Sequence, residues 1–568
     1  MLPNPSVKAI ARCFAFLTIS ATASVNPAIQ DAVGEGRTTL PDGRPAIVFE
    51  ANAPNGASAS WKLGSPMKAG WHTVEFGFGP ENQTRKLIQF ECLDANGSPV
   101  LSVNLYHAPS RSGSGDSCVM GVYLTKETTT LRWRKNQQRA MKSAPLVKLR
   151  IDDGRPASGT AFMEAVALEK SGDSFLFPMD LGRGHLRAVT SKPVALRWQQ
   201  AGGRSFETPS GNETTAWLSG DLAGLSCPVG DPGVCHLERR FESASPVDPS
   251  GLDRPLIPLL SGGRSQHVIE VRGTDLDPAK VKLAHFPDGA KMAAVLSWDD
   301  GIPQDKRAAE LMHRHGWRAS FFFNHHSPMV GRWKALEDLG MEVGSHSWSH
   351  PFYPLQSPQR CRDESVMMRR FLESKVNHPV ISFAYPFNYG AAFDADGDYV
   401  LRAQQEAGYL SCRSTMNGPL ALDAPGDPLV MRTDGHFLMG QEKIEAAWQL
   451  AAAKSRGIFY IWGHTYEIVK DEDWKSFEDL LRKYGKRPEA WYASQGDLMV
   501  WKLLREQSRV SATGDATRMK VVIDTPDLHP WWAARVPLAV HLGGSGLHAE
   551  SGGVSLQVIR GEVRIPAR

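Results

Sequence analysis

The segment AAVLSWDDGIPQDKRAAELMHRHGWRASFFF, from Ala293 to Phe323, decides the fold of the central part of this chain. Ala293–Trp298 is a largely apolar run typical of a buried strand, and Ala319–Phe323 is a second one. Between them, Asp305–His315 spaces its apolar residues as an amphipathic helix does. Two buried strands joined by a helix form a parallel βαβ unit, because the helix returns the chain to the end where the first strand began.

The same alternation continues to about Gln507. Further strands are predicted at 341–345, 381–385, 409–411 and 458–462, and helices at 332–339, 358–375, 395–407 and 442–453. Successive parallel βα units are most economically arranged as a (β/α) barrel. In such barrels the functional residues lie at the carboxyl ends of the strands.

Polar residues follow three of these strands. Asp299 and Asp300 follow the first strand, and His346 and His350 follow the strand at 341–345. His464 comes after the strand at 458–462. Because the carboxyl ends of parallel strands meet at one edge, these side chains are expected to lie together.

One Asp and two His are donors of the kind that a catalytic zinc site uses, with an open position left for water. We therefore predict that Asp300, His346 and His350 bind a divalent metal, with Zn²⁺ favoured and Co²⁺ or Ni²⁺ compatible. Asp299 is then free to act as the base on metal-bound water, and His464 as the general acid. Taken singly, the first motif also fits a turn with a helix cap, and the two histidines also fit a surface pair.

These motifs resemble those of the polysaccharide deacetylases of the NodB-homology type (carbohydrate esterase family 4). The family's TFDDG resembles Ser297–Gly301, its H-[ST]-x-x-H resembles His346–His350, and its late Leu-x-His is matched loosely by Ile461–His464. The resemblance covers Lys291 to Gln507. It implies a distorted (β/α) barrel, the same three metal ligands, and the same base and acid.

The chain departs from the family at the R-x-P-Y motif, which aligns with Ala384–Phe387 and lacks its arginine. The backbone N–H of Phe387 can still serve the oxyanion. Arg432 is a candidate to replace the arginine, but an ordinary surface arginine is the favoured interpretation unless the fold brings it close. Tyr385, Pro386 and Trp462 flank the motifs and are predicted to line the substrate site, with barrel packing as the alternative.

The family's D-x-x-D-W motif has no match before His464. Asp471–Trp474 is similar but follows that histidine, so we expect it to begin a helix. Asp434 is predicted to replace the missing carboxylate partner of His464.

The resulting functional prediction is an exported metal-dependent polysaccharide deacetylase that hydrolyses acetyl groups, N-acetyl being favoured, from an acetylated polysaccharide. One alternative is an O-acetyl esterase. Another is a catalytically weak carbohydrate-binding or matrix-assembly protein with a degenerate barrel, which the missing arginine motivates.

Charge and targeting limit the partners further. The 64 basic and 61 acidic side chains leave a net charge of +3, which gives no electrostatic case for nucleic acid or an anionic membrane. Residues 1–23 read as a signal peptide, with basic Lys8 and Arg12, the apolar stretch Cys13–Ser20 and a small-residue cleavage site. No stretch is long enough to span a bilayer, so a periplasmic or extracellular location is expected.

Six cysteines remain after the signal peptide. Their even number in an exported protein favours disulfides, although 15 connectivities are possible and buried free thiols are the alternative. Proximity in the sequence suggests the pairs Cys92–Cys118, Cys227–Cys235 and Cys361–Cys412.

The chain is therefore expected to be a multidomain α/β plus β protein, with the barrel flanked by β-sandwich-like domains. The predicted parts are a signal peptide at 1–23, a β-sandwich-like and possible carbohydrate-binding domain at 24–170, a second β-rich region at 171–288, the barrel at 289–508, and a small C-terminal β module at 509–568.

Overall fold

The structure is a computed structural model with two compact units. It describes residues 254–565 except 330, 419 and 424–425, and before them 29–34, 37–39, 45–48, 58–78, 88–104, 117–124, 126–135, 145–153, 163–171, 174–176, 184–230 and 235–240. Unit 1 holds the described residues up to 240 together with 354–357 and 391–399, and unit 2 holds the remainder. The predicted signal peptide lies outside the described residues.

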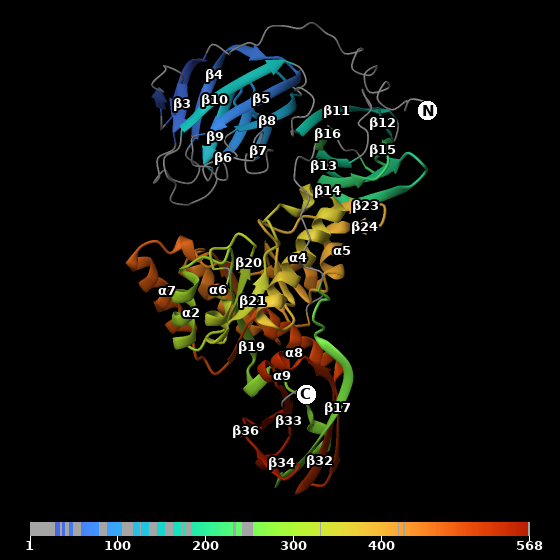
Figure 1. Cartoon of the computed structure of the whole chain (residues 1–568), viewed down its shortest axis with the longest axis vertical. Helices are drawn as coiled ribbons and strands as arrows, with labels where there is room; N and C mark the ends of the chain where they lie inside the picture. Colours follow the sequence, from blue (N-terminus) through green and yellow to red (C-terminus); the bar gives the residue numbers. More distant parts are fainter. Residues whose placement is uncertain are drawn as a thin grey trace. The chain divides into compact units, whose positions relative to one another are not determined.

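Unit 2 is built around a sheet of parallel strands (Figure 1). The main strands, in their order across the sheet, are β29 (Gly457–Gly463), β19 (Met292–Trp298), β20 (Ala319–Phe323), β21 (Glu342–Ser345), β22 (Ser382–Ala384), β25 (Ser411–Asn417) and β27 (Met431–Thr433). Two short strands attach at the sides: β30 (Ala490–Ala493) runs parallel to β19, and β26 (Leu420–Ala421) runs antiparallel to β29. Every residue of β19, β20 and β21 is buried, as expected of strands covered on both faces.

One segment joins the two edges of this sheet. β27 pairs with β25, and β28 (Gly435–His436) pairs with β29. Asp434 lies between them: its N–H donates to the carbonyl of Tyr460 at 2.8 Å, and its carboxylate accepts the N–H of Tyr460 at 2.7 Å. The sheet is thus nearly closed, which confirms the predicted barrel. Because its carboxylate is engaged at this seam, Asp434 is not the partner of His464, and that prediction is wrong.

Helices pack around the barrel (Figure 1). They are α2 (Asp305–Arg314), α3 (Trp333–Glu337), α4 (Pro358–Val376), α5 (Tyr399–Glu406), α6 (Gln441–Ala453), α7 (Asp471–Tyr484) and α8 (Gln495–Gln507). As predicted, Asp471 begins a helix. α5 begins four residues later than predicted, because β23 (Ala392–Asp394) and β24 (Gly397–Asp398) form a hairpin there, with Gly397 at φ +102° in the turn.

The strands after the barrel pair with a strand that precedes it. β17 (Leu260–Thr274) lies between β32 (Arg518–Leu528) and β34 (Ser545–Ser551), with β31 (Arg509–Gly514) and β35 (Val554–Leu556) at the edges. A second small sheet contains β18 (Lys282–Leu283), β33 (Leu538–His541), β37 (Glu562–Ile565) and β36 (Val558–Ile559).

These C-terminal strands share one hydrophobic core with the barrel. Val521 and Trp532, the latter on α9 (Pro530–Arg535), belong to the same buried cluster as Val295 and Trp501. The predicted boundaries at 288/289 and 508/509 therefore do not separate compact units. Residues 254–288 belong with the C-terminal strands, because β17 is hydrogen-bonded to β32 along most of its length.

Unit 1 is rich in strands, as predicted. One five-stranded sheet contains β1 (Ile29–Gly34), β4 (Ser58–Met67), β9 (Thr128–Lys135), β6 (Ile88–Leu93) and β7 (Pro99–Asn104). Another contains β2 (Arg37–Thr39), β3 (Pro45–Val48), β10 (Pro145–Asp153), β5 (Gly70–Phe78) and β8 (Ser117–Leu124). A third sheet includes β15 (Leu222–Ser226), β12 (Ser174–Leu176), β11 (Met163–Ser171), β16 (Cys235–Arg240), β13 (Gly184–Gln200) and β14 (Ser205–Leu218). Sandwich packing and carbohydrate binding in this part stay predictions.

The three disulfides predicted from sequence proximity are wrong. Cys92, Cys227, Cys361 and Cys412 are all free and buried, so each predicted pair contains at least one free thiol. Cys92 and Cys118 lie on strands of different sheets, and the thiol of Cys361 faces the carbonyl of Tyr353 at 3.4 Å. In the described part of the chain, no helix is long and apolar enough to cross a membrane.

Candidate active site

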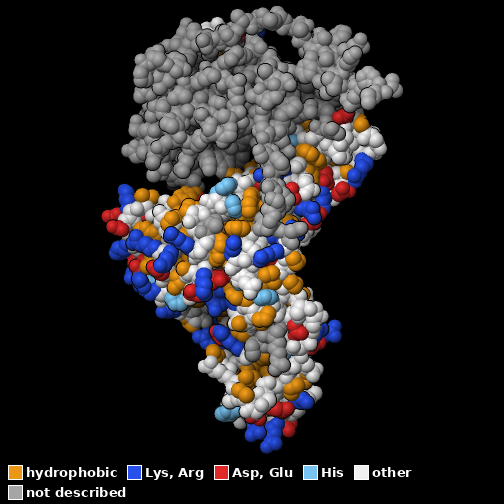
Figure 2. All heavy atoms as spheres, viewed as in Figure 1, with side chains coloured by type: hydrophobic (Ala, Val, Ile, Leu, Met, Phe, Trp, Pro, Cys, Tyr) orange, Lys and Arg blue, Asp and Glu red, His pale blue; other side chains and the backbone are white. Residues whose placement is uncertain are grey.

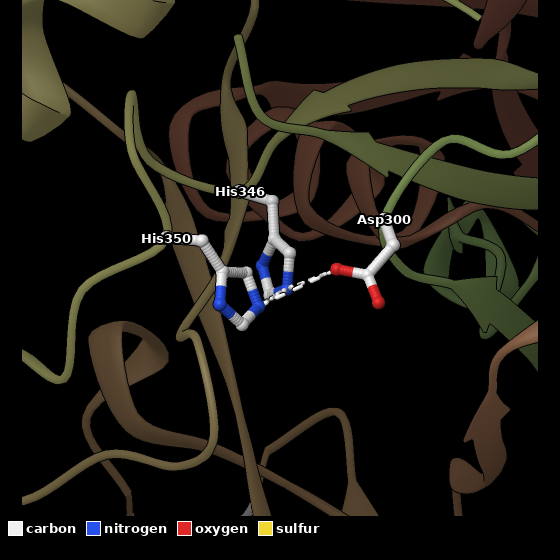
Figure 3. Close-up of side chains that lie close together, drawn as sticks. All are labelled: Asp300, His346 and His350. Atoms are coloured by element: carbon white, nitrogen blue, oxygen red, sulfur yellow. Dashed lines mark hydrogen bonds and ion pairs between the residues drawn. The ribbon is translucent and has the colours of Figure 1, made fainter. Parts of the chain in front are cut away.

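Three of the predicted residues converge at the carboxyl ends of β19 and β21. The Nε2 atoms of His346 and His350 are 3.1 Å apart, and they lie 3.8 Å and 3.4 Å from Oδ1 of Asp300. Figure 3 shows both imidazole rings presenting a nitrogen toward this carboxylate. His346 is buried, whereas the other two are half-buried, so the cluster is open on one side.

This donor set fits a divalent metal. Ligands at about 2.0–2.1 Å from a tetrahedral zinc ion are about 3.3 Å from one another, which lies within the range of separations seen here. Nδ1 of His346 is 2.8 Å from the carbonyl of Ala384, so this nitrogen carries the proton and leaves Nε2 with its lone pair toward Asp300.

The backbone around the cluster is strained. Asp300, Ser347, His350 and Phe387 all have positive φ, between +59° and +74°. Non-glycine residues in this region cost energy and persist only where the surrounding structure holds them. These backbone conformations bring side chains from separate loops to one point.

Hydrogen bonds from neighbouring segments hold this backbone. The hydroxyl of Ser327 donates to the carbonyl of Asp300 at 2.6 Å, and the hydroxyl of Ser347 accepts the N–H of His350 at 2.9 Å. Glu364, on α4, accepts both the N–H and the hydroxyl of Ser349, at 2.7 and 2.6 Å. Arg360, one turn earlier on α4, pairs with the same carboxylate at 2.7 Å. The loop that carries His350 is therefore fastened to α4.

Asp299 is buried beside the cluster of Asp300, His346 and His350, and its Oδ2 lies 3.9 Å from Nε2 of His346. The same oxygen accepts a hydrogen bond from Nη2 of Arg413, a fully buried residue on β25. Oδ1 of Asp299 is also buried and has no hydrogen-bond partner among the described residues. The guanidinium of Arg413 stacks over Trp462, 4.9 Å from the ring centre.

Arg413, and not Arg432, is therefore the arginine that contacts Asp299. Arg432 is exposed, and its Nη1 donates to the carbonyl of Asn417 at 3.4 Å. Its strand, β27, places the side chain outside the barrel. In the sequence, Arg413 comes two residues after the end of the strand predicted at 409–411. A strand extended to Arg413 would have marked it as a charged residue in a buried strand, but the predicted strand stopped short of it.

His464 lies on the other side of Asp300, with Nε2 3.9 Å from Oδ2 of that residue. Its carboxylate partner is Glu467, whose Oε1 is 3.2 Å from Nδ1 of His464. Burial lowers the pKa of His464, but the hydrogen bond and charge of Glu467 and the charges of Asp300 and Asp299 outweigh it and raise the pKa above its ordinary value. A raised pKa suits a general acid, because the imidazole is protonated before the reaction.

Glu467 also accepts a hydrogen bond from His436, with 2.8 Å between Oε2 and Nε2. The N–H of Leu438 donates to Nδ1 of His436, so Nε2 is the protonated nitrogen. Burial raises the pKa of Glu467, and the hydrogen bonds from His436 and His464 lower it well below its ordinary value. The trio His436, Glu467 and His464 is also close enough to hold a metal, and its distances equally fit one carboxylate that forms ion pairs with two imidazoles.

Asp305 lies beneath the site at the start of α2 and is fully buried. Its Oδ1 accepts the hydroxyl of Thr465 at 2.5 Å, and its Oδ2 accepts the N–H of Ile302 at 2.9 Å. Burial raises the pKa of Asp305 to about 8, although both hydrogen bonds act in the opposite direction. The sequence analysis did not select this residue, because only its depth distinguishes it from an ordinary helix-capping Asp.

The predicted substrate residues divide into two groups. Tyr385 is buried and donates its hydroxyl to the carbonyl of Leu429 at 2.9 Å, and Pro386 is also buried. The burial of both residues favours the alternative that they pack inside the barrel. Phe387 and Trp462 are half-buried, and the ring of Phe387 lies 4.6 Å from that of His350. These two remain candidates for contact with substrate.

Comparison with known proteins gives a family match over part of unit 2. Residues 287–410 match the family model described as Polysaccharide deacetylase, which confirms the resemblance over this part of the chain. The match includes Asp299, Asp300, His346 and His350 but ends before Arg413 and His464. A search of curated proteins gives no match.

Three solved structures illustrate the structural likeness. The Xyl-CE4 domain of a multidomain xylanase from the hindgut metagenome of Trinervitermes trinervoides is 17% identical, covering 38% of this chain and 92% of that one, with a TM-score of 0.26. The family 4 carbohydrate esterase from Streptomyces lividans is 14% identical, covering 34% and 86%, with a TM-score of 0.24. BA3943 from Bacillus anthracis, a CE4 family pseudoenzyme, is 18% identical, covering 40% and 70%, with a TM-score of 0.25. At TM-scores this low the likeness says nothing about the activity of this chain.

Proposed function

We propose that this chain is an exported, metal-dependent hydrolase that removes acetyl groups, chiefly N-acetyl, from a polymeric glycan. The observation that carries the proposal is the convergence of two imidazoles and one carboxylate beside a second, buried carboxylate, Asp299. The family-model match supports a carbohydrate as the substrate class.

A divalent ion, Zn²⁺ by the nature of the donors, would be held by Asp300, His346 and His350 and would supply Lewis acidity at the acetyl carbonyl. Asp299 takes the proton from the attacking water, through the oxygen that Arg413 does not engage. Arg413 acts by orienting this carboxylate.

His464 donates its proton to the departing nitrogen of the sugar. Glu467 supports this role, since it orients the imidazole through Nδ1 and raises the pKa of the ring. The backbone N–H of Phe387 is proposed to stabilise the oxyanion, at a residue whose positive φ sets the direction of its amide groups.

The test is acetate release by the purified protein from two substrates side by side, oligomers of N-acetylglucosamine and O-acetylated xylan. We expect release from the first that a chelator abolishes and added Zn²⁺ restores. Asp299→Asn should remove activity and keep the metal, whereas Asp300→Ala and His346→Ala should lose both. Metal content is measured by elemental analysis.

Other outcomes separate the alternatives. Release from O-acetylated xylan alone would replace the amide with an ester as the bond that is broken. No release from either substrate while the metal is bound would contradict the enzymatic proposal and favour a carbohydrate-binding role. Tight zinc binding by both ligand variants would overturn the ligand assignment.

A further inference from the structure

A pocket lies at the opposite end of the barrel strands from Asp299 and the proposed metal ligands. It has a volume of about 450 Å³, and its walls come from β30, the segment between α7 and β30, the end of α9 and the C-terminal strands. Ala490 and Trp491 line it, and Ala490 pairs with Met292, the first residue of β19. Asp299 follows the last residue of the same strand, so the length of β19 separates the two sites by about 20 Å.

The pocket is strongly basic. Six cationic side chains line it, and Asp288 is the one carboxylate among the lining residues. The six are Arg318, Lys486, Arg487, Arg535, Arg560 and Arg564. The chain as a whole has a net charge of only +3, so this concentration of charge is local.

Internal ion pairs neutralise only part of this charge. Asp288 pairs with Arg564, and the buried Asp497 behind the pocket pairs with Arg535 and lies 3.6 Å from Arg318. Burial lowers the pKa of Arg318, and the charges of Arg535 and Arg564 lower it further against the pull of Asp497. The cations of the pocket therefore repel one another.

The other three cations have no acidic partner. Lys486, Arg487 and Arg560 are exposed, and across the residues described for unit 2 none of them forms an ion pair with a carboxylate. Instead, Arg487 and Arg560 donate to the backbone carbonyls of Lys483 and Pro488, at 2.9 and 2.7 Å, which keeps their guanidinium groups beside the pocket.

This differs from the basic surface on the helices. Figure 2 shows Lys and Arg side chains gathered over the region of α2 and α7. There, Lys306 pairs with Glu310 and Lys475 with Asp479, each four residues further along its helix. Ion pairs of this kind are an ordinary way to stabilise a helix. Cations without acidic partners around a pocket repel one another and so destabilise the fold, and a bound anion would relieve this repulsion.

Aromatic rings complete the pocket. Trp491 and Tyr492 are half-buried in its wall, and Trp491 packs against Trp501 with 6.0 Å between ring centres. A rigid aromatic surface beside several guanidinium groups suits a sugar ring that carries acidic substituents, since arginine binds carboxylate and phosphate in a fixed planar geometry. The volume lies within the range of pockets that bind small ligands.

We propose that this pocket binds carboxylate-bearing sugar units of a glycan. It would hold an acidic part of the polymer away from the catalytic centre. The choice of a glycan rests on the proposed function, but binding is measured separately from acetate release, so either proposal can fail without the other.

The experiment measures binding of a tetramer of galacturonic acid by isothermal calorimetry, with the neutral tetramer of glucose, cellotetraose, as the reference. The test variant is Lys486→Gln/Arg487→Gln, in which both side chains are exposed. The matched control is Arg509→Gln/Lys520→Gln, which removes two exposed cations from β31 and β32, outside the pocket. Asp299→Asn is included as a catalytically disabled protein.

We expect the acidic tetramer to bind to the natural chain, the control and Asp299→Asn alike, and at least about tenfold more weakly to the test variant. Cellotetraose should not compete. Acetate release from a short neutral substrate should be unchanged in the test variant.

Three results would overturn the proposal: equal weakening in the test and control variants, binding of pyrophosphate without binding of the acidic tetramer, or tighter binding of a single-stranded oligonucleotide than of the acidic tetramer. The first would show a general charge effect, the second a site for a small anion, and the third a site for nucleic acid.

Discussion

At the scale of single residues, the site depends on buried charges that meet across the barrel. Arg413 and Asp299 are both nearly inaccessible, and the two residues lie 114 positions apart in the chain. An ion pair of this kind is expensive to break, because the remaining charge stays buried without its partner.

Replacing Arg413 with Ala is therefore expected to destabilise the protein by about 3–5 kcal/mol and to lower kcat by at least about a hundredfold. The metal should remain bound, since Arg413 touches none of its ligands. Denaturant unfolding, metal analysis and steady-state kinetics measure the three effects. The matched variant Arg432→Ala changes an exposed arginine and should leave all of them unaltered. A variant with the activity of the natural chain would show that Asp299 needs no arginine.

The buried carboxyl group of Asp305 is expected to make the stability of the fold depend on pH. Burial raises its pKa to about 8 in the fold, from an ordinary value of 3.8. The folded protein then holds a proton that the unfolded chain releases, so this residue destabilises the fold progressively as the pH rises from about 4 to about 8. The isosteric variant Asp305→Asn removes this titration. We expect the variant to gain stability relative to the natural chain by up to several kcal/mol over this interval.

Urea unfolding of both proteins at about pH 5 and about pH 8 gives the comparison. A difference in unfolding free energy that does not change between the two values would mean that Asp305 is ionised in the fold at both.

At the scale of elements, a helix fastens the loop that carries His350, a proposed metal ligand. Glu364 on α4 receives two hydrogen bonds from Ser349, the residue before His350, and is itself held by Arg360. Side chains of this kind set the orientation of metal ligands without touching the metal, and their loss typically costs about 10–100-fold in metal affinity.

Glu364→Ala should accordingly weaken zinc binding by about 10–100-fold and leave the barrel folded. Glu364→Gln keeps an acceptor for the N–H of Ser349 and should recover much of the affinity. Competition with a chromophoric chelator measures the constants, and circular dichroism checks the fold. Equal affinity in all three proteins would show that the loop holds its conformation without α4.

At the scale of unit 2, one core joins the barrel to the C-terminal strands. Trp532 is 1% exposed, and its ring N–H donates to the carbonyl of Pro379 at 2.9 Å, in the segment that leads into the strand β22. β17 and β32 contribute Ile269 and Val521 to the same core. These strands are therefore part of the folding unit that positions the site.

A chain ending at residue 508 is expected to fail to fold, because it leaves β17 without β32 and exposes the shared core. The point variant Trp532→Ala should lower the free energy of unfolding by about 3–5 kcal/mol. Trp531→Ala, which changes the neighbouring and more exposed ring, should cost less. Differential scanning calorimetry of unit 2 should show one transition. A stable, zinc-binding truncated chain would contradict the shared core.

The sequence by itself determined the local features of this protein. The strands β19 and β20 follow from uninterrupted apolar runs, and helix α2 follows from its spacing of apolar residues. Asp299, Asp300, His346 and His350 were recognisable because they stand directly after such strands or close behind them. Strand ends and motif spacings depend only on short stretches of sequence. The periodicity of apolar residues is also a property of short stretches, so it can predict them.

Only the tertiary structure decided which distant residues serve the site. Arg413, rather than Arg432, meets Asp299 because β25 is placed by its pairing with β22, and Glu467, rather than Asp434, meets His464 because Asp434 is engaged at the seam of the barrel. β17 precedes the barrel in the sequence and β32 follows it, yet the two strands pair. The predicted domain boundary at 288/289 therefore does not separate compact units. Such contacts depend on register and on closure of the sheet, which bring together segments more than a hundred residues apart, and no local pattern encodes them.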